Sequence, residues 1–549
     1  MKASDLFVKC LEAEGVEYIF GIPGEENADT MISLMDSNID FVLCRHEQAA
    51  AFMADVYGRL TGKAGVCLGT LGPGATNLVT GVADGNMDRA PMIVITGQAD
   101  THRLHKESHQ NMDAVDMFKP ITKWTFSIRQ PENIPEVVRK AFKVATAEKP
   151  GACHIELPED LAEHEMKKPL VPLEPRRVRR PGADHKAITQ AMDLIKKAKR
   201  PIILAGNGSI RKRASAQLRI FAEKTGIGVV STFMGKGSVS RHDPHCLFTM
   251  GLQARDHVTC EMEKADLVIA VGYDLVEYHP AFWNNGADKK IIHLDFNEAE
   301  VEAKYLPDVE LVADIADSLW KLNEIVPDKP LFDVARLKGL REEILADFAE
   351  HANDDAEGAI KPQKALWDCR EVLGPNDILL SDVGAHKMWI GRYYQCDEPN
   401  TCLISNGFCT MGFALPGAMG AKLVFPDRKV LAIGGDAGTM MNIQDLETAV
   451  RRKLNIVQLI WEDCEYGLIK WKQQNSFGKH SDLAFTNPDF VKLAEAFGAW
   501  GKRVEKSKDL RPALEEAFAQ DRPAIITIPI DYSENMKLTA RLGQLTCKL

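Results

Sequence analysis

Short apolar runs that end in small or acidic residues recur along the chain, each followed by a helical pattern. The run Val-Leu-Ala-Ile at 430–433 breaks into Gly-Gly-Asp-Ala-Gly at 434–438, and a second apolar run at 456–461 ends in Glu-Asp, with Asp463 last. Between them apolar positions recur at helical spacing. Apolar runs of this length, bounded by small residues, are typical of buried strands. The segment therefore predicts a unit of strand, turn, helix and strand.

The same order of patterns occurs near the start of the chain. An apolar run at 66–68 leads into Gly-Thr-Leu-Gly-Pro-Gly-Ala-Thr-Asn at 69–77, and a helical pattern over 78–87 precedes another apolar run at 92–96. The two halves of the chain thus carry the same α/β unit with a glycine-rich strand end. This repetition indicates a duplicated fold.

Two polar stretches divide the chain. Residues 173–187 are rich in Pro and Arg, residues 350–358 are polar, and both read as linkers. At about 100 to 200 residues per domain, 549 residues predict about three domains. Further apolar runs lie between the linkers, at 201–204, 228–230, 267–271 and 290–294. We predict an α/β fold of three doubly wound parallel sheets, in domains at 1–172, 188–349 and 359–549.

Composition narrows the class of protein. Hydrophobic residues make up 45% of the chain and charged residues 26%, as in folded globular domains. The net charge of −11 argues against a nucleic-acid partner, which would need a basic surface. Acidic residues interrupt the first apolar stretch, so no signal peptide is expected, and no run reaches the ~18 apolar residues of a membrane span. The twelve cysteines form no C-x-x-C pair, which argues against zinc and a disulfide scaffold and favours a cytoplasmic location.

Two carboxylates follow neighbouring strands of the unit predicted at 430–461. Because parallel strands end at the same edge of a sheet, we expect Asp436 and Asp463 to lie side by side. Two carboxylates beside glycine amides suit Mg²⁺ that carries a phosphorylated ligand. An ordinary βαβ unit with acidic strand ends is the alternative.

Other common catalytic motifs do not occur in the sequence. We find no Gly-Lys-Ser/Thr phosphate loop and no G-x-S-x-G elbow, so a kinase or an esterase has no motif to support it. Gly206 and Gly208 form a G-x-G turn without the rest of the dinucleotide fingerprint, and we interpret it as structural.

The segment 434–463 resembles the diphosphate-binding signature of thiamine-diphosphate enzymes, with Gly-Asp-Ala in place of Gly-Asp-Gly and Glu-Asp at its end. This resemblance implies thiamine diphosphate and Mg²⁺ as cofactors. The implied metal ligands are the side chains of Asp436 and Asp463 and the main-chain carbonyl of Glu465.

The first domain also carries a resemblance. RHEQAAAFMADVYGRLTG at 45–62 and GTLGPGATNLVTGVADGNMDRAPMIVITGQ at 69–98 are similar to the amino-terminal domain of the acetolactate synthase and pyruvate oxidase family. The resemblance makes Glu47 the catalytic glutamate beside the aminopyrimidine ring of the cofactor. It places Gln110, in KESHQNMD, on the side of the substrate. Near the ring it places Pro23, Thr70, Gly74 and Asn77.

In the third domain, SDVGAHKMW at 381–389 is similar to the diphosphate turn of the family, and SNGFCTMG at 405–412 to the loop that supports the bent cofactor. The residues that the resemblance assigns to the cofactor are Gly384, Ala385, His386, Met411, Asp436, Ala437, Gly438, Tyr466, Gly467 and Leu468. Met411 and Leu468 are expected to form apolar walls.

Two lysines follow in GLIKWKQQ. We predict that Lys472 offers a point charge to the carboxylate of a second substrate. The alternative is that Lys470 and Lys472 lie on a solvated helix face, as lysines commonly do.

The sequence of the middle domain indicates whether the protein binds FAD. The sequence GYDLVEYHPAFWN at 272–284 replaces the Arg-rich loop of flavin-binding members and resembles the FAD-free, fermentative acetolactate synthases, so FAD is not expected.

The resemblance as a whole implies a thiamine-diphosphate carboligase of the thiamine-diphosphate enzyme fold that joins two 2-keto acids. The expected reaction converts two molecules of pyruvate to 2-acetolactate and CO₂. Glu47 and the Asp436–Asp463 pair meet across a subunit boundary in this family, so we expect a homodimer at minimum and a homotetramer as the common form. A simple 2-keto acid decarboxylase and a catalytically silent, binding or regulatory paralogue stay as alternatives, although a silent protein would need none of Glu47, Asp436 and Asp463.

Overall fold

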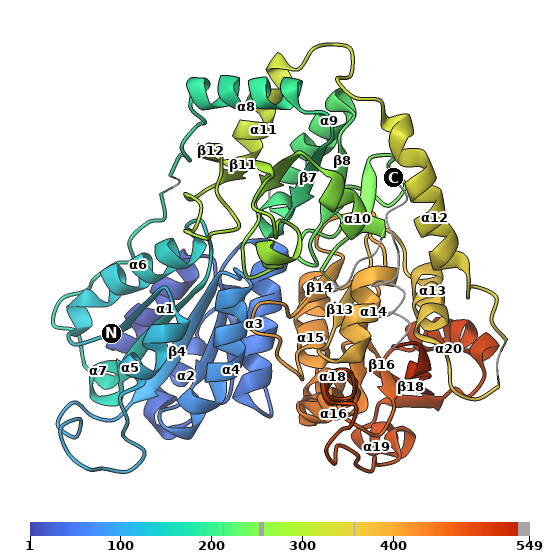
Figure 1. The fold of residues 1–549 in the computed structure, drawn as a ribbon. Helices are drawn as coiled ribbons and strands as arrows, with labels where there is room; N and C mark the ends of the chain where they lie inside the picture. The colour runs from blue at the N-terminus through green and yellow to red at the C-terminus, as the bar shows by residue number, and fades with distance from the viewer. Residues whose placement is uncertain (177, 212, 252–256, 356, 536–549) are drawn as a thin grey trace.

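Three six-stranded parallel sheets organise the computed structural model, which describes residues 1–549 except 177, 212, 252–256, 356 and 536–549 (Figure 1). In Figure 1 the first domain (blue) and the third (orange to red) lie side by side, and the middle domain (green) lies above them. Neighbouring strands are parallel throughout, because each connection crosses over through a helix or a long segment. The predicted α/β fold of three parallel sheets is confirmed.

The first sheet has the order β2-β1-β3-β4-β6-β5. Its strands are β1 (Tyr18–Gly21), β2 (Asp40–Leu43), β3 (Gly65–Gly69), β4 (Met92–Gln98), β5 (Trp124–Ser127) and β6 (Ala152–Pro158). Its helices are α1 (Ala3–Ala13), α2 (Ala28–Leu34), α3 (Glu47–Thr61), α4 (Pro73–Met87), α5 (Ala114–Phe118), α6 (Ile134–Thr146) and α7 (Glu159–Glu163).

The middle sheet has the order β12-β11-β10-β7-β8-β9. Its strands are β7 (Pro201–Ala205), β8 (Gly228–Ser231), β9 (Cys246–Thr249), β10 (Leu267–Val271), β11 (Lys290–Asp295) and β12 (Val309–Val312). Its helices are α8 (His185–Lys197), α9 (Ala214–Thr225), α10 (His257–Lys264), α11 (Ile315–Ile325) and α12 (Lys338–Ala349). Helix α8 begins before the predicted domain start at 188, because Asp184 caps it by accepting a hydrogen bond from the Ala187 amide at 2.9 Å.

The third sheet has the order β14-β13-β15-β16-β18-β17. Its strands are β13 (Ile378–Ser381), β14 (Cys402–Ile404), β15 (Val430–Gly435), β16 (Val457–Glu462), β17 (Trp500–Arg503) and β18 (Ala524–Pro529). Its helices are α13 (Pro362–Val372), α14 (Ala385–Tyr393), α15 (Ala414–Val424), α16 (Asp436–Met440), α17 (Leu446–Arg451), α18 (Gly467–Phe477), α19 (Phe490–Phe497) and α20 (Leu510–Phe518).

The first and third sheets have the same topology. Both place their second strand at one edge and their fifth strand at the other, with the remaining strands in the same order. The two domains therefore present corresponding strand ends, as the repeated sequence pattern predicted. No helix in the described part of the chain combines the length and the apolar character that crossing a membrane requires.

Two elements begin earlier than the sequence pattern predicted. Helix α4 starts at Pro73 rather than at 78, because Pro73 occupies the first helical turn and Gly72 turns the chain with a φ of +53°. Gly74 and Asn77 consequently lie in the first turns of a helix rather than in a loop. Asp436 likewise opens the short helix α16 directly after β15.

Helices α3 and α15 join the first and third domains. Small residues let their backbones approach closely: a Cβ at Gly420 would lie 2.8 Å from the Met53 carbonyl oxygen. The rings of Phe52 and Phe413 pack edge to face beside this contact, with centroids 5.6 Å apart. The contact buries apolar side chains of both domains in one continuous core.

Gly420→Ala is expected to destabilise the protein by about 1–3 kcal/mol, because the added methyl group forces two packed backbones apart. The measurement is the shift in Tm and in the midpoint of urea unfolding. Gly339→Ala is the matched control, because a Cβ at Gly339 meets nothing within 4 Å. Equal Tm values for the two variants would contradict this account of the domain contact.

Candidate active site

Glu47 lies at the carboxyl edge of the first sheet. Helix α3 begins at Glu47, and the His46 imidazole caps it by accepting a hydrogen bond from the Gln48 amide at 3.1 Å. The Glu47 side chain is buried, with 6% of its surface exposed, and its carboxylate accepts a hydrogen bond from Asn77 Nδ2 at 2.9 Å. The structure thus brings Glu47 and Asn77 together across α3 and α4.

Two further predicted residues, Thr70 and Gly74, lie near Glu47. A Cβ at Gly74 would lie 3.4 Å from Glu47 Oε1 and 3.0 Å from the Thr70 methyl group, so Gly74 leaves room for a neighbour there. A Cβ at Gly24, next to Pro23, would lie 2.4 Å from Thr70 Cβ. Thr70 and Gly74 therefore lie close to Glu47, whereas Pro23 is exposed and precedes Gly24, which packs against Thr70.

The third domain holds a cavity of about 240 Å³ at the carboxyl edge of its sheet. All of its lining residues lie between 383 and 532. The lining contains every third-domain residue predicted to bind the cofactor or the metal, which are Gly384, Ala385, His386, Met411, Asp436, Ala437, Gly438, Asp463, Glu465, Tyr466, Gly467 and Leu468. Segments far apart in the sequence thus converge on one cavity.

Asp436 and Asp463 both line this cavity. Asp436 is 1% exposed, and its Oδ2 accepts hydrogen bonds from the amides of Cys464 at 2.8 Å and Asp463 at 3.2 Å. Burial and the nearby Asp436 carboxylate raise the pKa of Asp463 to about 7. A buried carboxylate and a half-buried one that repel each other are suited to a divalent cation such as Mg²⁺.

Glu465 and Gly467 complete this part of the cavity. The Glu465 carbonyl oxygen accepts a hydrogen bond from the Gly467 amide at 2.9 Å, and a carbonyl has a second lone pair for a further partner. A Cβ at Gly467 would lie 2.3 Å from Asp463 Oδ2, so only glycine leaves the carboxylate in place. The donor set of two carboxylates and one main-chain carbonyl matches the chemistry of a magnesium site.

His386 and the start of α14 line another part of the cavity. His386 is 2% exposed, and its Nε2 has no hydrogen-bond partner among the described residues. Burial lowers the pKa of His386 to about 4, so the imidazole is neutral at pH 7. An unpaired imidazole nitrogen and the free amides at a helix N-terminus fit a diphosphate group.

Two acidic residues that the sequence reasoning missed hold the loop that carries Met411. Asp382 Oδ1 accepts a hydrogen bond from the Gly412 amide at 2.8 Å, and burial raises the pKa of Asp382 to about 6. Asp84, on α4 of the first domain, accepts hydrogen bonds from Ser405 Oγ at 2.6 Å and Thr410 Oγ1 at 3.0 Å. The first domain therefore helps to position the Met411 loop of the third domain.

Tyr532 is a further lining residue that the sequence reasoning did not assign to the site. It follows β18 and lines the cavity next to the two carboxylates. Burial and the charges of Asp463 and Asp436 raise the pKa of its hydroxyl well above the usual value. The sequence signal was the position of Tyr532 directly after a predicted strand that ends at the same sheet edge.

Gln110 and Lys472 lie apart from the cavity lining. Gln110 is exposed and packs its backbone against Gly72, where an added Cβ would lie 3.0 Å from the Gln110 carbonyl oxygen. Lys472 is exposed on α18, whereas Lys470 pairs with Glu465 at 2.6 Å and lines an adjoining cavity of about 610 Å³. The catalytic roles of Gln110 and Lys472 stay predictions.

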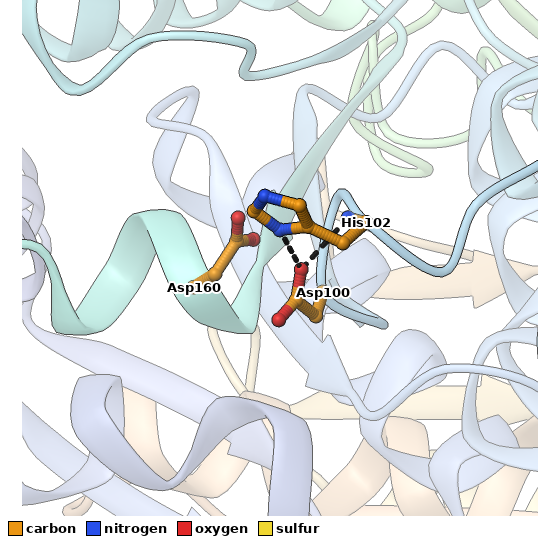
Figure 2. A group of neighbouring side chains, drawn as sticks. All are labelled: Asp100, His102 and Asp160. Atoms are coloured by element: carbon orange, nitrogen blue, oxygen red, sulfur yellow. Dashed lines mark hydrogen bonds and ion pairs between the residues drawn. The ribbon is translucent and has the colours of Figure 1, made fainter.

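Asp100, His102 and Asp160 form a second group with metal-binding side chains, on the surface of the first domain (Figure 2). Figure 2 shows His102 turned toward Asp100, whose Oδ1 accepts hydrogen bonds from His102 Nδ1 and from its backbone amide, both at 2.7 Å. Asp160 accepts hydrogen bonds from the amide and the hydroxyl of Thr101. These contacts indicate that the three residues anchor the loop at 100–102.

The G-x-G turn of the middle domain binds a carboxylate of the protein itself. Glu277 Oε1 accepts hydrogen bonds from the amides of Asn207 and Asp274, both at 3.0 Å. Cβ atoms at Gly206 and Gly208 would lie 2.5 Å and 2.6 Å from atoms of Gly272, so both glycines are needed for packing. This geometry supports the interpretation of the G-x-G sequence as a structural turn.

Comparison with known proteins agrees with this geometry. The N-terminal TPP binding domain of thiamine pyrophosphate enzymes matches residues 1–117, the central domain matches 188–322, and the C-terminal TPP binding domain matches 382–528. The chain is therefore a thiamine pyrophosphate enzyme.

Full-length relatives narrow the family. The chain is 36% identical to an acetolactate synthase of Bacillus subtilis, over 98% of this chain and 95% of the relative. It is 38% identical to a catabolic acetolactate synthase of Raoultella terrigena, over 98% and 97%. A probable acetolactate synthase large subunit of Methanocaldococcus jannaschii is 36% identical over 100% and 95%. Within its class, the chain belongs to the acetolactate synthase family.

Proposed function

We propose that the chain is an acetolactate synthase that decarboxylates pyruvate and joins the two-carbon fragment to a second pyruvate. The observation that carries this proposal is the third-domain cavity, in which Asp436, Asp463 and His386 converge. The similarity to acetolactate synthases over nearly the whole chain supports the same reaction.

Thiamine diphosphate, when bound, supplies a thiazolium carbon that adds to a 2-keto acid and stores the electrons released with CO₂. Asp436, Asp463 and the Glu465 carbonyl would hold Mg²⁺, and His386 with the α14 amides would hold the diphosphate. Met411 and Leu468 would exclude water from the reacting atoms.

Glu47 is the proposed acid-base residue. Its buried carboxyl group, in the protonated form, would donate a hydrogen bond to a ring nitrogen of the aminopyrimidine and so help to move a proton onto and off the cofactor. Asn77 holds the Glu47 side chain in place through its hydrogen bond at 2.9 Å. The proton transfer and the metal site are therefore assigned to different domains.

The placement of Glu47 and the metal site in different domains suggests how copies of the chain assemble. Among the described residues, those that line the cavity all belong to the third domain, and Glu47 lies in the first. We infer that a second copy of the chain brings its Glu47 to this cavity, so that a homodimer is the smallest active form and a homotetramer is the expected one. We also propose that the enzyme requires Mg²⁺ and does not bind FAD.

The fate of the two-carbon fragment separates a synthase from a simple decarboxylase. A decarboxylase must deliver a proton to the carbon that becomes the aldehyde group. Among the residues that line the two adjoining cavities, the one histidine is His386, which is assigned to the diphosphate. The lining therefore favours ligation.

With pyruvate alone, acetolactate is expected as the main product and acetaldehyde as a minor one. Acetolactate is measured as acetoin after acid treatment, and acetaldehyde by coupling to alcohol dehydrogenase. Adding 2-ketobutyrate tests the choice of acceptor, and Lys472→Ala is expected to raise the acetaldehyde share. Acetaldehyde as the dominant product of the wild type would instead establish a 2-keto acid decarboxylase.

A further inference from the structure

A segment far along the chain lies against the loop that carries the metal ligands. Residues 483–485 run antiparallel to residues 464–466: the Tyr466 amide donates to the Leu483 carbonyl at 3.1 Å, and the Phe485 amide donates to the Cys464 carbonyl at 2.9 Å. The rings of Tyr466 and Phe485 pack edge to face, with centroids 5.4 Å apart. The loop after β16 is thus held by a second strand-like segment.

Asn487 ends this segment in a fixed position. Pro488 restricts the backbone of Asn487 to extended conformations. Asp489 then caps α19 by accepting hydrogen bonds from the amides of Val491 and Lys492, both at 3.1 Å. Phe490, which is 2% exposed, anchors α19 in the core. The local sequence Asn-Pro-Asp-Phe therefore fixes the backbone position of Asn487.

The Asn487 amide contacts a metal ligand directly. Asn487 Nδ2 donates a hydrogen bond to Asp436 Oδ2 at 2.8 Å and lies 3.4 Å from Cys464 Sγ. With the amides of Asp463 and Cys464, three N–H donors converge on Oδ2. A carboxylate oxygen has about two lone pairs, so Oδ2 is saturated. Among the described residues, Asp436 Oδ1 accepts one hydrogen bond, from the Ala437 amide at 2.8 Å, which leaves a lone pair for a further partner.

We propose that Asn487 is a positioning residue for the metal site: its amide fixes the Asp436 carboxylate so that Oδ1 is the oxygen that binds Mg²⁺. This inference rests on the proposed function, because it takes Asp436 as a ligand. Hydrogen bonds that orient a metal ligand are worth about 10- to 100-fold in metal affinity. Asn487 itself does not touch the reacting atoms.

The test measures Mg²⁺ binding to the full-length protein in the presence of thiamine diphosphate. The Trp461 ring lies 6.3 Å from the His386 ring, so tryptophan fluorescence reports occupation of the cavity. For Asn487→Ala the apparent Kd for Mg²⁺ is expected to rise by about 10- to 100-fold, while kcat at saturating Mg²⁺ stays within about threefold of the wild type. Asn487→Leu, which keeps the branched shape of the side chain and removes the donor, is expected to give the same shift.

Asn455→Ala is the matched control, because Asn455 Nδ2 donates to the Gln520 carbonyl, at 3.5 Å, within the same domain. Its Kd for Mg²⁺ is expected to equal that of the wild type. An unchanged Mg²⁺ Kd in either folded Asn487 variant, or a lower kcat that saturating Mg²⁺ does not restore, would overturn the positioning role. Failure of the wild type to bind Mg²⁺ with thiamine diphosphate would instead overturn the proposed function itself.

Discussion

Asp463→Ala is expected to give a folded protein that no longer retains thiamine diphosphate. Asp463 is one of two aspartates that line the cavity, and its pKa of about 7 reflects its partial burial and the nearby charge of Asp436. Loss of one carboxylate halves the negative charge available to Mg²⁺, and the diphosphate depends on the metal. We expect the cofactor affinity to fall by more than ~100-fold, since a residue that only orients a metal ligand already contributes 10- to 100-fold.

The measurement is the thiamine diphosphate content after gel filtration in Mg²⁺ buffer, together with the Tm of the cofactor-free protein. That Tm should not fall, because the substitution removes repulsion between Asp463 and Asp436. Asp482→Ala, at an exposed position, is the control and should retain the cofactor. Wild-type cofactor content in Asp463→Ala would remove Asp463 from the metal site.

Short-range patterns in the sequence predicted the fold and the edges of the sheets where the site lies. Apolar runs that end in glycine or aspartate predicted the ends of β15 and β16, and parallel pairing then brought Asp436 and Asp463 together. The start of α4 was placed too late, because Pro73 was interpreted as part of a glycine-rich turn although it is favourable in the first turn of a helix.

The residues that the sequence reasoning missed act through contacts between distant segments. Asp382 binds the amide of Gly412, Asp84 binds hydroxyls of a loop in another domain, and Asn487 binds Asp436. Periodicity cannot predict such pairs, because neither partner has an unusual local pattern. Glu47, in contrast, was assigned because residues 45–62 resemble the amino-terminal domain of a known family.

Glu47→Gln is expected to bind thiamine diphosphate as the wild type does and to lose about 10²- to 10⁴-fold in kcat, the usual contribution of a general acid-base residue. Glutamine has the same shape as glutamate, and its carbonyl oxygen can still accept the hydrogen bond from Asn77. The amide cannot exchange a proton with a ring nitrogen in the way a carboxyl group does. The substitution therefore removes proton transfer and leaves packing and cofactor binding in place.

The measurements are kcat with pyruvate at saturating cofactor and Mg²⁺, and the Kd for thiamine diphosphate from tryptophan fluorescence. Glu136→Gln, at an exposed position on α6, is the control and should have the kcat of the wild type. A kcat of Glu47→Gln within a few-fold of the wild type would make Glu47 a structural residue. A catalytically silent paralogue would bind the cofactor but show no turnover, either as the wild type or as Glu47→Gln. A large fall in kcat at an unchanged Kd for thiamine diphosphate would therefore show that the protein is an enzyme and that Glu47 takes part in its chemistry.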